Sequence, residues 1–122
     1  MIGYTGNIEQ LTGQNNYFRQ VLFTSSHTQL VVMALQIGEE IGMETHKDND
    51  QFFRLESGTL KIIMNGEEST LVAGMVAIVP AGAQHNVINI GSEVAKLYTL
   101  YSPPHHPDKT IHKTKAEAMV AE

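Results

Sequence analysis

The stretch GEEIGMETHKDNDQFFRLESG, residues 38–58, gathers around one polar turn the side-chain types that bind metal ions. Glu44 and His46 are two residues apart, so in a strand they project from the same face. The segment KDND is a plausible turn, and Gln51 then opens the next strand with its side chain able to point back toward that face. We therefore predict that these three side chains converge from two neighbouring strands.

His85 is a fourth candidate ligand, because it begins a later strand directly after the turn-forming segment PAGAQ. The chain has no cysteine, so any metal must be held by nitrogen and oxygen. Two imidazoles, a carboxylate and an amide suit Fe, Mn, Ni, Zn or Co better than calcium. The alternative interpretation is that these groups are solvated around an ordinary turn, with His46 a partly buried, hydrogen-bonded residue.

Short β-type runs separated by turn signals make up most of the chain. We predict strands within the ranges 17–24, 30–37, 51–57, 58–70, 75–80, 85–90 and 95–102. Asn65-Gly66 predicts a hairpin inside the fourth range, since these residues favour the positive φ values of a tight hairpin turn. Strands of this length at regular spacing predict an all-β sandwich or barrel. The tail, 102–122, differs: proline-rich turns precede a helix-prone segment.

The amino-acid composition indicates the broad class of protein. The 122 residues fit one domain spanning 1–122. Eight Lys and Arg against 13 Asp and Glu give a net charge of −5, which argues against nucleic acid as a partner. No signal peptide is visible, and the apolar runs are too short to cross a bilayer, so we expect a cytoplasmic protein with no membrane partner.

Two stretches resemble the two motifs of the cupin superfamily. The first family motif, G-x5-H-x-H-x4-E-x6-G, matches in spacing Gly38, Glu44, His46, Gln51 and Gly58. The second, G-x5-P-x-G-x2-H-x3-N, matches Gly74, Pro80, Gly82, His85 and Asn89. This chain departs from the family pattern at two positions, with Glu44 in place of a histidine and Gln51 in place of a glutamate.

The resemblance implies a small antiparallel jelly-roll barrel (a double-stranded β-helix) with a metal near one open end, followed here by a short C-terminal helix. It implies one divalent transition-metal ion per chain, held by Glu44, His46, Gln51 and His85. These ligand types are also similar to those of the zinc-dependent mannose-6-phosphate isomerases, whose catalytic domain is cupin-like. The whole chain looks like the small single-domain bacterial cupins.

Other residues have a structural and a functional interpretation. Phe53 shares the strand face of Gln51, and core packing is favoured over a place beside the metal. We interpret Asn89 and the motif glycines as structural, and His27 as solvated. Tyr98 and Tyr101 face opposite sides of one strand, so at most one looks into the barrel. For His105, His106 and His112, a tail that packs over the barrel or a neighbouring subunit is favoured over a second metal site.

The leading hypothesis for function is a metal-dependent enzyme, an isomerase or a dioxygenase, acting on a small oxygen-rich molecule such as a sugar derivative or enediol. Glu44 would be a metal ligand or a catalytic base. The main alternative is a non-catalytic module that binds or senses a small molecule, and a third is a barrel whose metal site has decayed. Histidine ligands must be neutral to bind, so metal affinity should fall below about pH 6.

A homodimer is also expected, because small antiparallel barrels have exposed strand edges to cover. The candidate interfaces are the N-terminal strand region 1–24 and the C-terminal tail.

Overall fold

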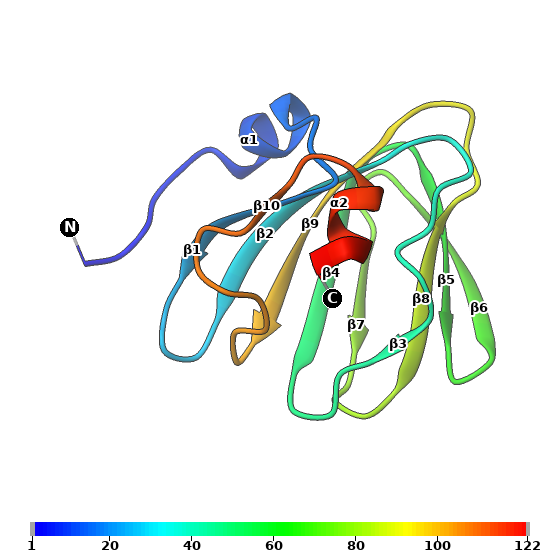
Figure 1. The fold of residues 1–122 in the computed structure, drawn as a ribbon. Helices are drawn as coiled ribbons and strands as arrows, with labels where there is room; N and C mark the ends of the chain where they lie inside the picture. Colours follow the sequence, from blue (N-terminus) through cyan, green and yellow to red (C-terminus); the bar gives the residue numbers. More distant parts are fainter. Residues whose placement is uncertain (1, 122) are drawn as a thin grey trace.

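The computed structural model of the chain describes residues 2–121, in which two antiparallel sheets face each other across one core (Figure 1). The larger sheet has the order β10 (Ile111–His112), β1 (Arg19–Thr24), β2 (Gln29–Leu35), β9 (Ala95–Ser102), β4 (Asp50–Ser57) and β7 (Val76–Val79). The smaller sheet has the order β3 (Glu44–Thr45), β8 (Gln84–Asn89), β5 (Thr59–Met64) and β6 (Glu67–Val72). This arrangement confirms the predicted all-β jelly-roll barrel.

The predicted strands are confirmed to within about two residues at their ends, as expected for strand boundaries. The hairpin between β5 and β6 turns at the predicted dipeptide, where Asn65 has φ 47° and Gly66 has φ 85°. The predicted C-terminal helix is α2 (Lys115–Ala121). Neither helix of residues 2–121 is long and apolar enough to cross a membrane.

In the N-terminal strand region 1–24, the predicted strand is confirmed as β1, but it is preceded by a helix that was not predicted, α1 (Ile8–Gln14). Asn7 caps this helix, with its Oδ1 accepting a hydrogen bond from the Gln10 amide at 3.0 Å. Seven residues that include Gly13 have little intrinsic helicity. The helix depends on its cap and on contacts with β9, β4 and β2, which the local sequence does not reveal.

The tail also contains a strand that was not predicted. β10 pairs with β1, placing His112 opposite Arg19 and Ile111 opposite Gln20. A two-residue strand has no readable alternation, so only its partner 93 positions earlier in the chain defines it. The tail therefore returns to the barrel and extends the larger sheet (Figure 1).

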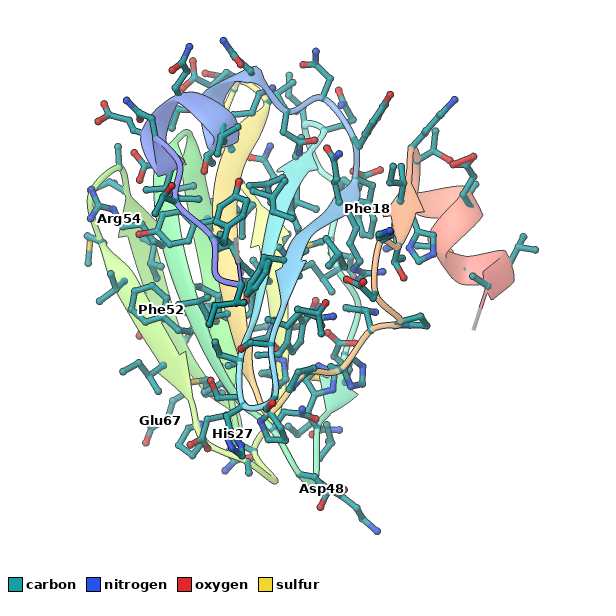
Figure 2. All side chains as sticks on the ribbon, turned by 90° about the vertical axis from the view of Figure 1, so that its left-hand side faces the viewer. Phe18, His27, Asp48, Phe52, Arg54 and Glu67 are labelled. Carbon is teal, nitrogen blue, oxygen red and sulfur yellow. The ribbon has the colours of Figure 1, made fainter. Side chains whose placement is uncertain are left out.

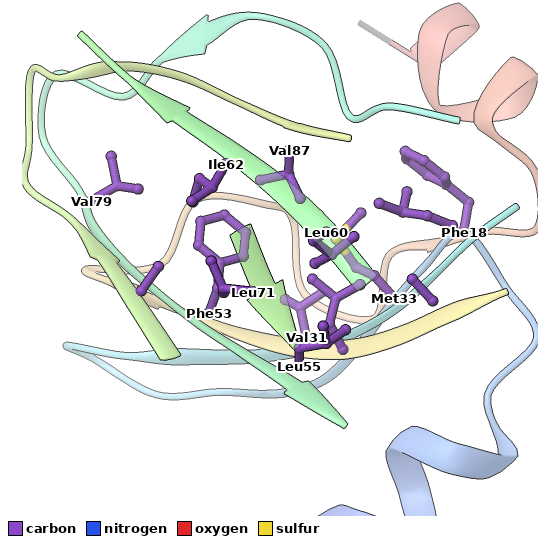
Figure 3. Close-up of a cluster of buried hydrophobic side chains, with 14 of the residues drawn as sticks. Phe18, Val31, Met33, Phe53, Leu55, Leu60, Ile62, Leu71, Val79 and Val87 are labelled. Atoms are coloured by element: carbon purple, nitrogen blue, oxygen red, sulfur yellow. The ribbon is translucent and has the colours of Figure 1, made fainter. Parts of the chain in front are cut away.

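The core lies between the two sheets and is filled by inward-facing residues of most of the strands (Figure 3). On β4, Phe53 and Leu55 are 1% and 0% exposed and belong to this core. Other alternating residues also belong to this core: Met33, Leu35, Ile62 and Val87 are buried, and Met64 packs against it. Each such side chain contributes roughly 1.5–3 kcal/mol by leaving water.

The side chains between these core residues point outward. Figure 2 shows Phe52 and Arg54 on the outer face of the larger sheet, and also places His27 and Asp48 in turns at the same end of the barrel. His27 is exposed, as predicted.

Candidate metal centre

Strand pairing brings three of the predicted ligands together. β3 pairs with β8 so that Glu44 lies directly opposite His85, and opposite residues of an antiparallel pair share a face. His46 is two positions beyond Glu44 and so returns to that face. The Gly82 amide donates a hydrogen bond to the His46 carbonyl at 2.9 Å, which ties this segment to the turn that leads into β8.

The potential ligand atoms of Glu44, His46 and His85 all lie within 4.8 Å of one another. Glu44 Oε1 is 3.3 Å from His46 Nε2 and 3.9 Å from His85 Nε2. Both Nε2 atoms are nevertheless buried with no hydrogen-bond partner among the described residues. Ligands bound about 2.0–2.2 Å from one zinc ion are separated in just this way, since each points at the ion and not at its neighbour.

A hydrogen bond at Nδ1, the other ring nitrogen of His85, fixes the orientation of this ring. His85 Nδ1 is 3.0 Å from the Ala83 carbonyl, which can only accept, so Nδ1 carries the proton. In the neutral ring, Nε2 then presents its lone pair toward the Glu44 carboxylate. Two electron-rich atoms facing each other are unfavourable unless a cation lies between them, and fixing the ring through Nδ1 is the usual support of a metal-binding histidine.

Glu44 is suited to bind a cation because it stays ionised. Burial tends to raise the pKa of its carboxyl group. The neighbouring imidazoles of His46 and His85 outweigh burial and hold this pKa below its ordinary value. The Arg19 guanidinium lowers the pKa of Glu44 further, by a smaller amount. Its side chain is 25% exposed, so the carboxylate also borders the opening of the site.

Gln51 comes from the opposite sheet. It is 1% exposed, and its Nε2 donates a hydrogen bond to Thr99 Oγ1 at 3.0 Å, while its Oε1 has no partner among the described residues. Its register partner Tyr101 has its ring 5.7 Å from the His46 ring. Phe53, two residues along β4, lies 6.3 Å from the His85 ring. Gln51 therefore faces the interior between two residues that contact the imidazoles.

These residues fit a divalent transition metal. Two imidazole nitrogens and one amide oxygen are buried without hydrogen-bond partners, and a carboxylate supplies the charge. A buried polar atom without a partner costs free energy, which a bound cation would recover.

A wall of the site comes from the tail and was not identified as part of the site from the sequence. The His105 ring lies 4.2 Å from the His46 ring and stacks on Tyr101 at 5.3 Å. Within residues 2–121, the three tail histidines lie outside the Glu44, His46 and His85 group. The preference for a tail that packs over the barrel is therefore confirmed.

Buried amides hold this tail in place. Gln29 is fully buried, and its Oε1 accepts from the His105 and His106 amides at 3.1 and 2.9 Å. Its Nε2 donates to the His106 carbonyl at 2.7 Å. Asn49, in the turn after His46, donates to the carbonyls of Pro103 and Pro104. The only local signal for this arrangement is that Gln29 begins an apolar strand.

Two further predictions are confirmed. Tyr101 is buried and faces the barrel interior, whereas Tyr98 faces outward and is only half-buried. Asn89 is structural: its Nδ2 lies 2.9–3.2 Å from the carbonyls of Leu35, Gln36 and Glu93.

A two-sheet antiparallel barrel with a Glu, His and His group at one end defines a small cupin-like protein. Residues 31–101 match the Cupin_2 family, described as a cupin domain, and the chain belongs to that family.

Three relatives show how far the likeness extends. The uncharacterized protein YrkC of Bacillus subtilis (strain 168) is 45% identical over 122 residues, covering 95% of this chain and 66% of YrkC. The uncharacterized protein L612 of Acanthamoeba polyphaga mimivirus is 43% identical over 112 residues, covering 88% of this chain and 70% of L612. The chain thus spans about two thirds of the length of these relatives. The crystal structure of BH2720 from Bacillus halodurans is 41% identical with a TM-score of 0.94, covering 96% of this chain and 93% of BH2720.

Proposed function

We propose that this protein binds one divalent transition-metal ion through Glu44, His46, Gln51 and His85 and catalyses a reaction of a small oxygen-rich molecule. The reaction classes that suit the site are isomerisation of a hydroxy-carbonyl compound and dioxygenation. The observation that carries the proposal is that His46 Nε2 and His85 Nε2 are buried without hydrogen-bond partners beside an ionised Glu44. The amide oxygen of Gln51, on the opposite sheet, is also buried without a partner.

A bound metal would supply Lewis-acid polarisation of substrate oxygens, or redox chemistry if it is iron or manganese. Glu44 borders the opening and is held ionised, so it can accept a substrate proton as a general base as well as bind the metal. His105 and Tyr101 flank His46 with aromatic surface. This surface limits the access of water to the site.

The test is metal titration of the full chain by calorimetry and elemental analysis after reconstitution with Zn, Mn, Fe(II), Ni or Co. We expect one equivalent in the wild type. His85→Ala and Glu44→Gln should weaken binding by more than the roughly 10–100-fold that loss of an outer-shell partner costs. His27→Ala, at an exposed turn, is the matched control. Affinity should also fall below about pH 6, where free histidine becomes protonated.

Two results would contradict this proposal: sub-stoichiometric metal after reconstitution, or equal affinity in all the variants. Catalysis is tested separately on the metal-loaded protein with panels of sugar phosphates, enediols and diketones. The enzyme hypothesis is supported if the protein shows turnover and Glu44→Gln reduces that turnover by a larger factor than it reduces metal binding. Tight binding of one compound without turnover would instead support the binding or sensing module.

A further inference from the structure

Arg19 is a buried cation without a carboxylate partner. It is 3% exposed, and it forms no ion pair with an acidic side chain of residues 2–121. Its Nη1 is 3.1 Å from His112 Nδ1, but its Nε has no hydrogen-bond partner there. Arg54, the other arginine of the chain, has Glu56 Oε1 at 3.4 Å from its Nε. The Arg19 charge acts on Glu44 and on the Tyr101 hydroxyl, and its guanidinium carbon lies 5.2 Å from the centre of the Phe18 ring. A buried charge without a carboxylate in contact is costly, so Arg19 requires a reason for its position.

Arg19 lines a cavity of about 340 Å³ between β1 and the tail. The other described residues around it are His105, His106, Pro107, Thr110, His112 and Ala121. None of these described lining residues is acidic, whereas one is a guanidinium and three are imidazoles. A cavity lined in this way favours a negatively charged group over a neutral or a positive one.

The cavity adjoins the candidate metal centre. His105 lines the cavity and also lies 4.2 Å, ring to ring, from His46. His106 Nε2 is 3.2 Å from the hydroxyl of Tyr101, whose ring also contacts His46. Burial raises the pKa of Tyr101, so its hydroxyl remains a neutral hydrogen-bonding group between the two sites. The cavity and the candidate metal centre therefore share a wall made by His105 and Tyr101.

We propose that this cavity is an oxyanion subsite, in which Arg19 binds a carboxylate or phosphate group of the molecule whose other oxygens reach the metal centre. A planar guanidinium carries N–H donors whose geometry matches either group. The subsite itself stands on Arg19 and its cavity. Only the link to the metal-bound part of the ligand rests on the proposed function.

The position of Arg19 in its strand also sets it apart from an ordinary surface arginine. In YFRQVLFT, residues 17–24, Arg19 is two positions before Val21 and so shares its inward face. A charged residue on the apolar face of a strand is unusual unless it is paired or binds a ligand.

The test titrates the metal-free full chain with inorganic phosphate and, separately, with succinate, using calorimetry and the shift in melting temperature. The wild type should bind at least one probe, and the tighter probe identifies the source of the oxyanion. Arg19→Gln should lose roughly tenfold or more in affinity, while Arg54→Gln should stay within about twofold of the wild type. Arg19→Lys keeps the charge but not the fork, so it should fall between them.

Failure of this proposal and failure of the proposed function give different results. Arg19→Gln should still bind one equivalent of metal, although loss of the charge that acts on Glu44 can shift the affinity. His85→Ala should lose metal while keeping the melting-temperature shift with the probe. The subsite is overturned if neither probe binds the wild type, if Arg19→Gln binds as the wild type does, or if Arg54→Gln loses as much. If Arg19→Gln does not fold, the affinity of Arg19→Lys for the probe is compared with that of Arg54→Gln. Equal affinities overturn the proposal.

Discussion

Compared with the cupin motif, the carboxylate has moved from the position of Gln51 to that of Glu44, where the motif has a histidine, and an amide takes its former place. The carboxylate now comes from β3, in the same sheet as His85, and the amide comes from β4 in the opposite sheet. Glu44 is a quarter exposed, whereas Gln51 is 1% exposed. A carboxylate at the fully buried position would lose more hydration than one at the opening, so this arrangement places the charge where it is less costly.

At the residue scale, His106 predicts a pH dependence of stability. Burial, with the positive charge of Arg19 and smaller contributions from neighbouring histidines, lowers the pKa of His106 from 6.5 to about 3. Between these values the unfolded chain binds a proton that the folded chain does not. Stability of the metal-free protein should therefore fall as pH drops below 6.5, with a contribution of up to about 1.4 kcal/mol per pH unit.

His106→Gln should reduce this slope in urea unfolding measured between neutral pH and about pH 5. His27→Gln is the matched control, because His27 is exposed and its substitution should leave the slope unchanged. Equal slopes in the wild type and His106→Gln would show that His106 does not contribute.

At the element scale, substitutions of two turn glycines allow the cost of backbone strain to be measured separately from the cost of steric overlap. Gly58 has φ 99° and Gly74 has φ 92°, both in the left-handed region. A Cβ at Gly58 would lie 2.9 Å from Ala95 Cα, whereas one at Gly74 would meet no atom within 4 Å. Gly74→Ala should cost about 1–2 kcal/mol from backbone strain alone, and Gly58→Ala should cost more. Equal losses in urea unfolding would contradict this explanation.

The tail is the element that joins the two candidate sites. Gln29 holds the backbone at His105 and His106, and β10 then adds His112 to the edge of the larger sheet. Because the fully buried Gln29 side chain bonds the tail backbone and β10 pairs with β1, the tail is part of the barrel wall and not a loose extension.

At the scale of the whole molecule, we expect a homodimer. The outer face of the larger sheet carries exposed apolar side chains at its β7 edge, where Val76 is 48% and Ile78 is 60% exposed, beside the half-buried Phe52. Ile78→Glu should then convert a dimer, with twice the 13.5 kDa chain mass, into a monomer with unchanged circular dichroism.

Size-exclusion chromatography with light scattering measures this change. Ile37→Glu is the control, since Ile37 is 63% exposed in the loop after β2. A wild-type mass of 13.5 kDa would contradict the dimer. A dimer that survives Ile78→Glu would exclude the β7 edge and leave the N-terminal region and the tail as candidate interfaces.

The sequence by itself determined the strands, the Asn65-Gly66 hairpin, and the spacing that places Glu44, His46, Gln51 and His85 on the motif positions. Those features depend on side-chain alternation and turn chemistry, which act between residues close in the chain. Only the tertiary structure decided that α1 forms, that the tail returns to pair with β1, and that Arg19 lies in a cavity beside His105. These features depend on contacts between segments up to 93 positions apart, such as that of Arg19 with His112, and no local pattern encodes them.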